Sequence, residues 1–237
     1  MIRGIHETQG VALGCYRLGR WPNANNPGSR LRLRFLPEPH FYVPRTHTMS
    51  STAAPLDLDS PYALTAEQIA RFRSDGYIKL KHVLSAAVIN HYAPIITAEV
   101  HRLNTMHLPL EQRDTYSKAF LQVGNIWTKN ETVKEFCWSQ RLARIATELL
   151  GVRGVRMYHD QALYKESGGG VTPWHADQYY WPLSNANTVT AWIPLQATPM
   201  EMGPLAFAKG SHRFEAGREL AISDESEERI GRSMKEQ

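Results

Sequence analysis

The stretch 171-VTPWHADQYYWPL-183 contains the residues of this sequence best suited to chemistry. His175 and Asp177 lie two positions apart, shortly after the glycines at 168–170. In an extended segment, side chains at positions i and i+2 point to the same face, so an imidazole and a carboxylate converge on one point. The spacing therefore predicts two metal ligands presented by one short element. The alternative interpretation is a hydrogen-bonded histidine–aspartate pair in a turn.

A block of helices is predicted ahead of this stretch. Each helix follows a serine or threonine that can cap it, and apolar residues then recur at helical spacing. Gln68 follows Thr65 by three positions, which is a capping-box pattern. The predicted helices cover residues 65–75, 86–104 and 140–151, and a short strand covers 77–80.

From residue 152 the sequence changes to short β-prone segments that are bounded by turn-forming residues. These segments cover residues 155–165, 188–196 and 204–212, and the chain is predicted to be helical again from about Ser226. Strands after a block of helices predict an α+β fold whose core is a sandwich or barrel of antiparallel strands. We expect one domain at 61–237, with a helical part at 64–151 and a strand-rich part at 152–237.

Composition restricts the class of protein. The chain has 237 residues and 42% hydrophobic content, enough for one sizeable core, and no apolar run approaches the ~18 residues of a membrane span. Cys15 and Cys137 are far apart and predict neither a disulfide framework nor a CxxC metal site, which favours a reducing compartment.

The formal net charge of +4 is concentrated near the N-terminus. Residues 1–48 contain seven arginines and two glutamates, which leaves 27 − 7 = 20 basic and 23 − 2 = 21 acidic residues in 49–237. A nearly neutral body argues against a nucleic-acid-binding protein. Residues 1–60 are predicted to be an irregular, Arg-rich extension and linker. They are interpreted as a transit peptide or, alternatively, as a mis-extended reading frame that precedes a true start at Met49.

Three segments, in this order, resemble the phytanoyl-CoA dioxygenase family of iron(II)- and 2-oxoglutarate-dependent oxygenases. They are 161-QALYKESGGGVTPWHADQYYWPL-183, 190-TAWIPLQ-196 and 201-EMGPLAFAKGSHR-213. The resemblance extends from about Leu64 to the C-terminus and includes the segment Asp75-Gly76-Tyr77. A lone HxD triplet occurs by chance in many chains, whereas the ordered set is much more specific.

The resemblance implies a double-stranded β-helix, a jelly-roll or cupin-like sandwich with N-terminal flanking helices. It implies that His175 and Asp177 are two of the three ligands of a two-histidine, one-carboxylate iron(II) site. The implied reaction is hydroxylation of a small or medium organic substrate with O2, while 2-oxoglutarate is converted to succinate and CO2 and ascorbate serves as reductant. A carboxylate at position 177 argues against the halogenating variant of this chemistry.

The resemblance also assigns roles around the implied iron site. Lys165 and Trp192 match positions that line the 2-oxoglutarate pocket, and Tyr179, Tyr180 and Trp181 would form one wall of the substrate cavity. The glycines at 168–170 would form a mobile loop over the entrance. The alternative interpretations are an exposed strand lysine, a packing tryptophan and plain core aromatics.

The sequence departs from the family pattern near its C-terminus. The pattern needs a second histidine and then a basic residue on a later strand, whereas His212 is the only histidine after Asp177 and matches a structural turn. We therefore expect a C-terminally truncated oxygenase. The alternatives are a non-catalytic jelly-roll module that binds a ligand without the distal histidine, and a nucleic-acid binder that uses the basic N-terminal arm.

The expected partner is a small-molecule substrate, with no nucleic acid and no membrane, and the expected state is a monomer. Cytosol is the expected compartment, since there is no C-terminal SKL-type signal and the Arg-rich N-terminus gives only weak support for a mitochondrial or peroxisomal location.

Overall fold

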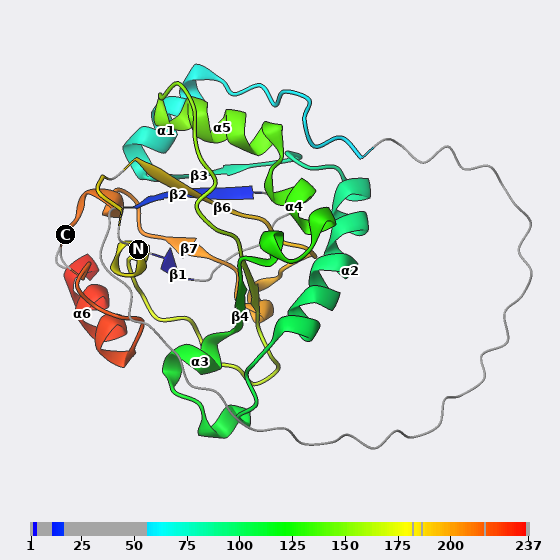
Figure 1. The fold of residues 1–237 in the computed structure, drawn as a ribbon. Coiled ribbons are helices and arrows are strands. Elements are labelled where there is room, and N and C mark those ends of the chain that lie inside the picture. Colours follow the sequence, from blue (N-terminus) through cyan, green and yellow to red (C-terminus); the bar gives the residue numbers. More distant parts are fainter. Residues whose placement is uncertain are drawn as a thin grey trace, which may run out of the picture. The chain divides into compact units, whose positions relative to one another are not determined.

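The computed structural model describes residues 2–3, 11–16, 56–181, 183–185, 187–215 and 217–235. Helices and antiparallel strands are both present, which confirms the predicted α+β class (Figure 1). In this described part of the chain, none of the helices combines the length and apolar character that crossing a bilayer requires.

The helices predicted from capping signals are present. In α1 (Ala66–Asp75), the Thr65 side chain accepts a hydrogen bond from the backbone N–H of Gln68, and the Gln68 side chain accepts one from the N–H of Thr65. Gly76 ends α1 in the left-handed conformation, with φ 84°. Ser85 caps α2 (Ala86–Leu103) and Ser139 caps α5 (Gln140–Leu150).

Several short elements lie between α2 and α5, where the sequence predicted none. They are α3 (Thr115–Ala119), β4 (Leu121–Gly124) and α4 (Glu131–Cys137). Asp114 and Asn130 accept hydrogen bonds from the N–H groups of Ser117 and Val133 and so cap α3 and α4. Helices of five and seven residues are too short to display a clear apolar period. The 3-10 helices are η1 (Leu110–Gln112), η2 (Ile126–Thr128), η3 (Asp177–Tyr180), η4 (Met200–Met202) and η5 (Ser211–Arg213).

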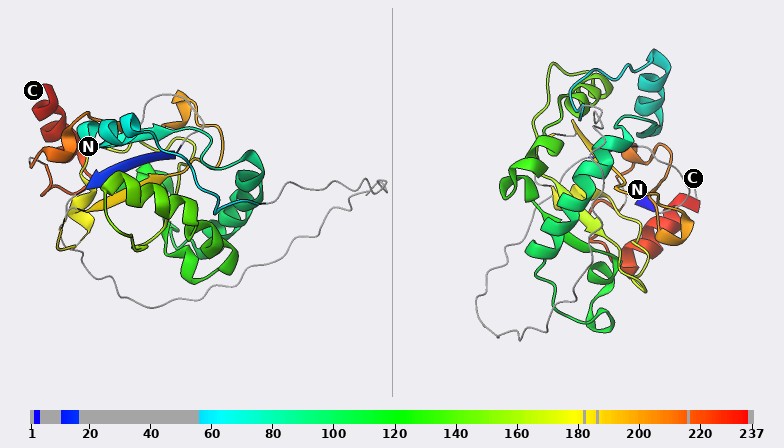
Figure 2. Two further views of the ribbon diagram at one scale, coloured as in Figure 1. Left: turned by 90° about the horizontal axis from the view of Figure 1, so that it is seen from above. Right: turned by 90° about the vertical axis from the view of Figure 1, so that its right-hand side faces the viewer.

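The strands form three small antiparallel sheets. One joins β1 (Ile2–Arg3) to β7 (Ala206–Phe207), and another joins β4 to β5 (Gln161–Tyr164). In the third, β2 (Val11–Tyr16) lies between β3 (Tyr77–Leu80) and β6 (Thr188–Trp192) (Figures 1 and 2). The strand-rich segments predicted at 155–165, 188–196 and 204–212 thus contain shorter strands.

Strands β1 and β2 fall within residues 1–60, which the sequence predicted to be an irregular extension. That prediction is wrong for residues 2–3 and 11–16, because β3 and β6 provide backbone partners on both sides of β2. Local sequence patterns do not contain such long-range pairing. The remainder of the predicted extension up to residue 55, with its transit-peptide and false-start interpretations, lies outside the described residues.

One apolar cluster joins the three-stranded sheet to helices α1 and α5. Phe72, Ile145 and Leu149 from the helices pack with Ile78 and Leu80 of β3, and these five residues are at most 6% exposed. A second cluster joins α2 and α4 and includes Val88, Tyr92, Ile96, Val100, Val133 and Phe136. The two clusters therefore attach α1 and α5 to β3, and α2 and α4 to β4 through Val123.

Arg141 anchors the segment before α1. Its guanidinium group lies 2.5 Å from Asp57 Oδ2 and donates hydrogen bonds to the carbonyl oxygens of Ser60 and Val83. Arg141 is only 8% exposed, so these acceptors compensate for the removal of its charge from water.

The final helix, α6 (Asp224–Lys235), begins two residues before the predicted start at about Ser226. Ser223 and Ser226 form a reciprocal pair at its start, in which each hydroxyl oxygen accepts a hydrogen bond from the backbone N–H of the other residue. Ser226 is fully buried and Ile230 is 1% exposed, so one face of α6 is fixed to the rest of the protein.

Candidate active site

His175 and Asp177 converge as the sequence predicted. The Nε2 atom of His175 lies 3.2 Å from Oδ1 of Asp177, and their side chains are 9% and 21% exposed. The pair is thus largely withdrawn from solvent, and the aspartate is the more accessible member.

The tautomer of His175 follows from its second contact. Its Nδ1 atom lies 2.7 Å from the carbonyl oxygen of Pro173. A carbonyl oxygen only accepts hydrogen bonds, so Nδ1 carries the proton. In the neutral ring, Nε2 then presents a free lone pair toward Asp177, which is the arrangement that a metal-binding histidine needs.

The backbone achieves this convergence without a strand. Residues 171–176 form no strand, and Asp177 already begins η3. Ala176 between the two residues is nonetheless extended, with φ −116° and ψ 121°, which is sufficient to direct the flanking side chains to one side.

Two side chains that sequence reasoning did not select interact electrostatically with Asp177. They are Tyr116 of α3 and His159. Gln122 of β4 is the hydrogen-bond partner of Tyr116. Burial, and to a smaller extent the neighbouring Tyr180 and Asp177, raise the pKa of Tyr116 to about 12. The Tyr116 phenol therefore stays protonated and donates to Oε1 of Gln122.

Burial also lowers the pKa of His159, although the charges of Asp160 and Asp177 partly oppose this effect. Its ring packs edge-on against Trp181, with centroids 5.7 Å apart. No sequence signal marked His159, Tyr116 or Gln122, because they come from separate elements that only the tertiary fold brings together.

The three predicted aromatic residues occupy different environments. Trp181 is 9% exposed and packs with Leu183, Leu205 and Phe207, in an apolar cluster to which Tyr180 also belongs. The Tyr180 ring lies 6.1 Å from that of Tyr116 and 4.9 Å from that of Tyr179. Burial raises the pKa of Tyr180, whose hydroxyl oxygen accepts a hydrogen bond from the N–H of Ile222 at 2.8 Å.

The glycine segment at 168–170 is held against α3. The N–H of Gly170 donates to the carbonyl oxygen of Lys118 at 3.3 Å, and Gly169 closes a turn onto Glu166. A Cβ atom at Gly169 would lie 2.8 Å from the Lys118 carbonyl oxygen, so the close approach requires glycine. Glu166 forms an ion pair with the buried Arg113. The segment predicted to be a mobile loop therefore has defined backbone partners.

Trp192 faces the same side of the three-stranded sheet as Tyr77. Gly14 of β2 pairs with Tyr77 of β3 and with Thr190 of β6, and residues that pair across antiparallel strands lie on the same face of the sheet. Trp192 follows Thr190 by two positions, so it shares this face with Tyr77. Tyr77 stacks on Phe207 with centroids 5.0 Å apart. Trp192 thus lies on the sheet face that carries the aromatic cluster around Trp181.

His212 lies at the end of α1. Its ring packs against Gly76, where an added Cβ would lie 2.1 Å from Nδ1. The same turn binds the end of α1 through the N–H of Gly210, which donates to the carbonyl oxygen of Asp75. These contacts fit the structural role predicted for His212.

The donor set of the His175–Asp177 pair fits a divalent transition metal. Such ions bind imidazole nitrogen and carboxylate oxygen at about 2.0 to 2.2 Å, so two adjacent ligands at a right angle lie about 3 Å apart. The observed separation of 3.2 Å matches this geometry. Among the residues that the structure describes, no group of three or more His, Cys, Asp or Glu side chains is arranged to hold a metal.

The chain matches an oxygenase family over most of its length. The family model of phytanoyl-CoA dioxygenase (PhyH) matches residues 72–236, which include His175 and Asp177. The chain therefore belongs to the phytanoyl-CoA dioxygenase family, and this confirms the resemblance described from the motifs. No solved structure matches the chain.

Proposed function

We propose that the protein is an iron(II)- and 2-oxoglutarate-dependent dioxygenase that hydroxylates a small or medium organic substrate and releases succinate and CO2. The observation that carries the proposal is the His175–Asp177 pair, with Nδ1 of His175 bound to a carbonyl oxygen and Nε2 directed at a carboxylate. Membership of an oxygenase family supports it.

In this proposal, His175 and Asp177 supply two of the iron ligands. Iron with 2-oxoglutarate and O2 would supply the oxidising power for hydroxylation. Lys165 and Trp192 are the proposed contacts of 2-oxoglutarate, and the fold is proposed to follow the double-stranded β-helix of the family.

The aromatic residues around the pair would shape the substrate cavity. Tyr179, Tyr180 and Trp181 are the proposed wall, and the buried, protonated Tyr116 extends it through its ring contact with Tyr180. Such a wall excludes water from the reacting atoms and leaves one phenolic hydroxyl in a defined hydrogen bond with Gln122. These features favour a substrate with an apolar body.

The test combines metal binding with turnover of the full 237-residue chain. Titration with Co(II) under nitrogen, followed by its visible absorption, measures the metal site without turnover. Succinate formation from 2-oxoglutarate with iron(II), ascorbate and air then measures the reaction. We expect His175→Ala to abolish both signals. His101→Ala, which removes an exposed histidine of α2, should leave both unchanged.

Two results would count against the proposal. If the folded chain binds no Co(II), the pair is not a metal site. If it binds Co(II) and 2-oxoglutarate but forms no succinate with iron(II) and a panel of candidate substrates, it is a ligand-binding module instead of an oxygenase.

A further inference from the structure

A single peptide group connects His175 to helix α6. This is the group between Pro173 and Trp174, whose carbonyl oxygen accepts the hydrogen bond from Nδ1 of His175 at 2.7 Å. Its N–H donates to Oε2 of Glu227 at 2.8 Å. Glu227 and the His175 ring therefore bind the two opposite edges of one peptide plane.

The planarity of the peptide bond makes this arrangement a mechanical link. Because the C=O and N–H lie in one plane and point in opposite directions, fixing the N–H also fixes the direction of the C=O. A carboxylate is the stronger kind of acceptor for an N–H group. Its bond to the N–H also polarises the peptide group and makes the carbonyl oxygen a better acceptor for Nδ1–H of His175.

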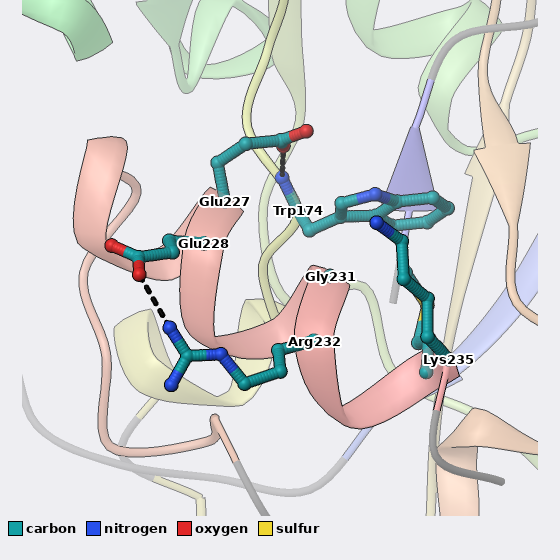
Figure 3. A pocket seen from close by; sticks show the side chains of 7 residues that line it. Trp174, Glu227, Glu228, Gly231, Arg232 and Lys235 are labelled. Carbon is teal, nitrogen blue, oxygen red and sulfur yellow. Dashed lines mark hydrogen bonds and ion pairs between the residues drawn. The ribbon is translucent and has the colours of Figure 1, made fainter.

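Packing covers only part of Trp174. Its side chain packs against the apolar cluster of Leu220 and Ile230, and a pocket of about 460 Å³ is lined by Trp174 and by residues of α6 as far as Lys235 (Figure 3). The hydrogen bond that the Trp174 N–H donates to Glu227 is thus a directional contact from α6 that sets the orientation of the Pro173–Trp174 peptide group.

Helix α6 is itself well placed to hold this orientation. Ile230, on its buried face, packs against Gly217, where an added Cβ would lie 2.5 Å from Cγ1 of Ile230. The segment just before α6 provides a second attachment, because the N–H of Ile222 donates to the Tyr180 hydroxyl. The His175–Asp177 segment is thus held at Trp174 and again at Tyr180.

We propose that Glu227 is a positioning residue for His175, acting through the Pro173–Trp174 peptide group to keep the proton on Nδ1 and the lone pair on Nε2. The part of this proposal that makes Glu227 important for a metal site rests on the proposed function. Ligating histidines generally depend on such an outer hydrogen bond for tautomer and ring orientation, and its loss lowers metal affinity by about 10- to 100-fold.

Neighbouring Glu228 provides a matched control. Figure 3 shows the Glu227 carboxylate directed at the backbone nitrogen of Trp174, whereas Glu228 points away from it and pairs with Arg232. Glu228 and Arg232 are both exposed. Glu228→Ala therefore removes a carboxylate from the same turn of α6 without touching Trp174.

The experiment compares Glu227→Ala, Glu227→Gln and Glu228→Ala in the full chain. The metal-free readouts are amide exchange of the peptide that contains Trp174 and the ring ¹⁵N shifts of His175, which distinguish the two tautomers of the neutral ring. The His175 signal is assigned by its absence from His175→Ala. The third readout is Co(II) affinity.

We expect Glu227→Ala to speed exchange at Trp174, to shift His175 away from the pure Nδ1–H tautomer and to weaken Co(II) binding about tenfold. Glu227→Gln retains an acceptor oxygen and should restore most of each signal, and Glu228→Ala should match the wild type. If Glu227→Ala does not fold, Glu227→Asp replaces it, because the shorter side chain withdraws the same charge from the N–H.

An unchanged His175 tautomer in Glu227→Ala or Glu227→Asp would overturn the inference, even if the unfolding temperature falls. The same holds if exchange and tautomer change but Co(II) affinity does not. If the wild type binds no Co(II), the proposed metal site fails. The tautomer and exchange measurements then decide by themselves whether Glu227 positions His175.

Discussion

The Nζ atom of Lys165 lies 2.9 Å from the carbonyl oxygen of Ala119, the last residue of α3. The same ammonium group donates to the carbonyl oxygen of Gly170 at 3.1 Å and to Oγ1 of Thr172 at 3.3 Å. One lysine thereby fastens α3 to the segment that leads into His175. The residue selected as a 2-oxoglutarate ligand already has a definite role in holding this segment.

Lys165→Met keeps the alkyl chain, which packs on Gly203, and removes the ammonium group. We expect faster amide exchange in residues 166–172, because two carbonyl groups lose their donor. If Lys165 also binds 2-oxoglutarate, the concentration of 2-oxoglutarate needed for half-maximal succinate formation rises as well. Lys129→Met, at an exposed position, is the control. Unchanged exchange in residues 166–172 would refute the fastening role.

Tyr180→Phe tests the attachment of the segment before α6. The variant leaves the N–H of the buried Ile222 without its acceptor, at a cost of about 1 to 3 kcal/mol in the free energy of unfolding. Urea unfolding measures this cost. Tyr158→Phe removes a hydroxyl from a residue that is 49% exposed and should cost much less. If the two variants lose equal amounts of unfolding free energy, the hydrogen bond to the Tyr180 hydroxyl does not stabilise the fold.

Asp57→Asn should change how stability depends on pH. Backbone hydrogen bonds, foremost from Ser60, lower the pKa of Asp57 to about 2 from 3.8, and the Arg141 side chain contributes. A lowered folded-state pKa gives stability that is fully present above the unfolded-state pKa and is lost as pH falls toward the folded-state value.

The stability difference between wild type and Asp57→Asn should therefore shrink as the pH falls from about 5 to about 2. Unfolding midpoints measured across this range provide the check. Glu67→Gln, at an exposed position of α1, should show no comparable trend. A difference that stays constant across the range would contradict the assignment to Asp57.

Removal of residues 1–48 tests whether β2 belongs to the folded protein. Without it, β3 and β6 lose their shared neighbour, and the exposed strand edges should lower the unfolding temperature and promote aggregation. A matched deletion of residues 22–48 keeps β2 and removes most of the basic segment. If both deletions behave like the full chain, β2 is dispensable for folding.

Local signals predicted much of the scaffold. Thr65, Ser85 and Ser139 cap the helices predicted from them, because a capping hydrogen bond depends only on residues within one turn. His175 and Asp177 could be paired from spacing alone for the same reason: the geometry is set by the extended residue between them.

Contacts between distant segments were not predictable in this way. Glu227 follows Trp174 by 53 positions, and no periodicity or motif relates the two. Tyr116 and Gln122 reach the site from a short helix and a short strand whose patterns are too brief to recognise. Their part in the site comes from the tertiary fold.

The pairing of β2 with β6 also determines when the sheet can form during synthesis. Leu13 lies opposite Ala191, so one of the first segments to be made must wait for one of the last. At about 5 to 20 residues per second, the delay is on the order of ten to forty seconds. Until then, within the described part of the chain, the sheet consists of β2 and β3 alone, and the edge of β2 that pairs with β6 has no partner. A nascent chain of this kind completes its sheet late and depends on protection of the open edge of β2 while translation continues.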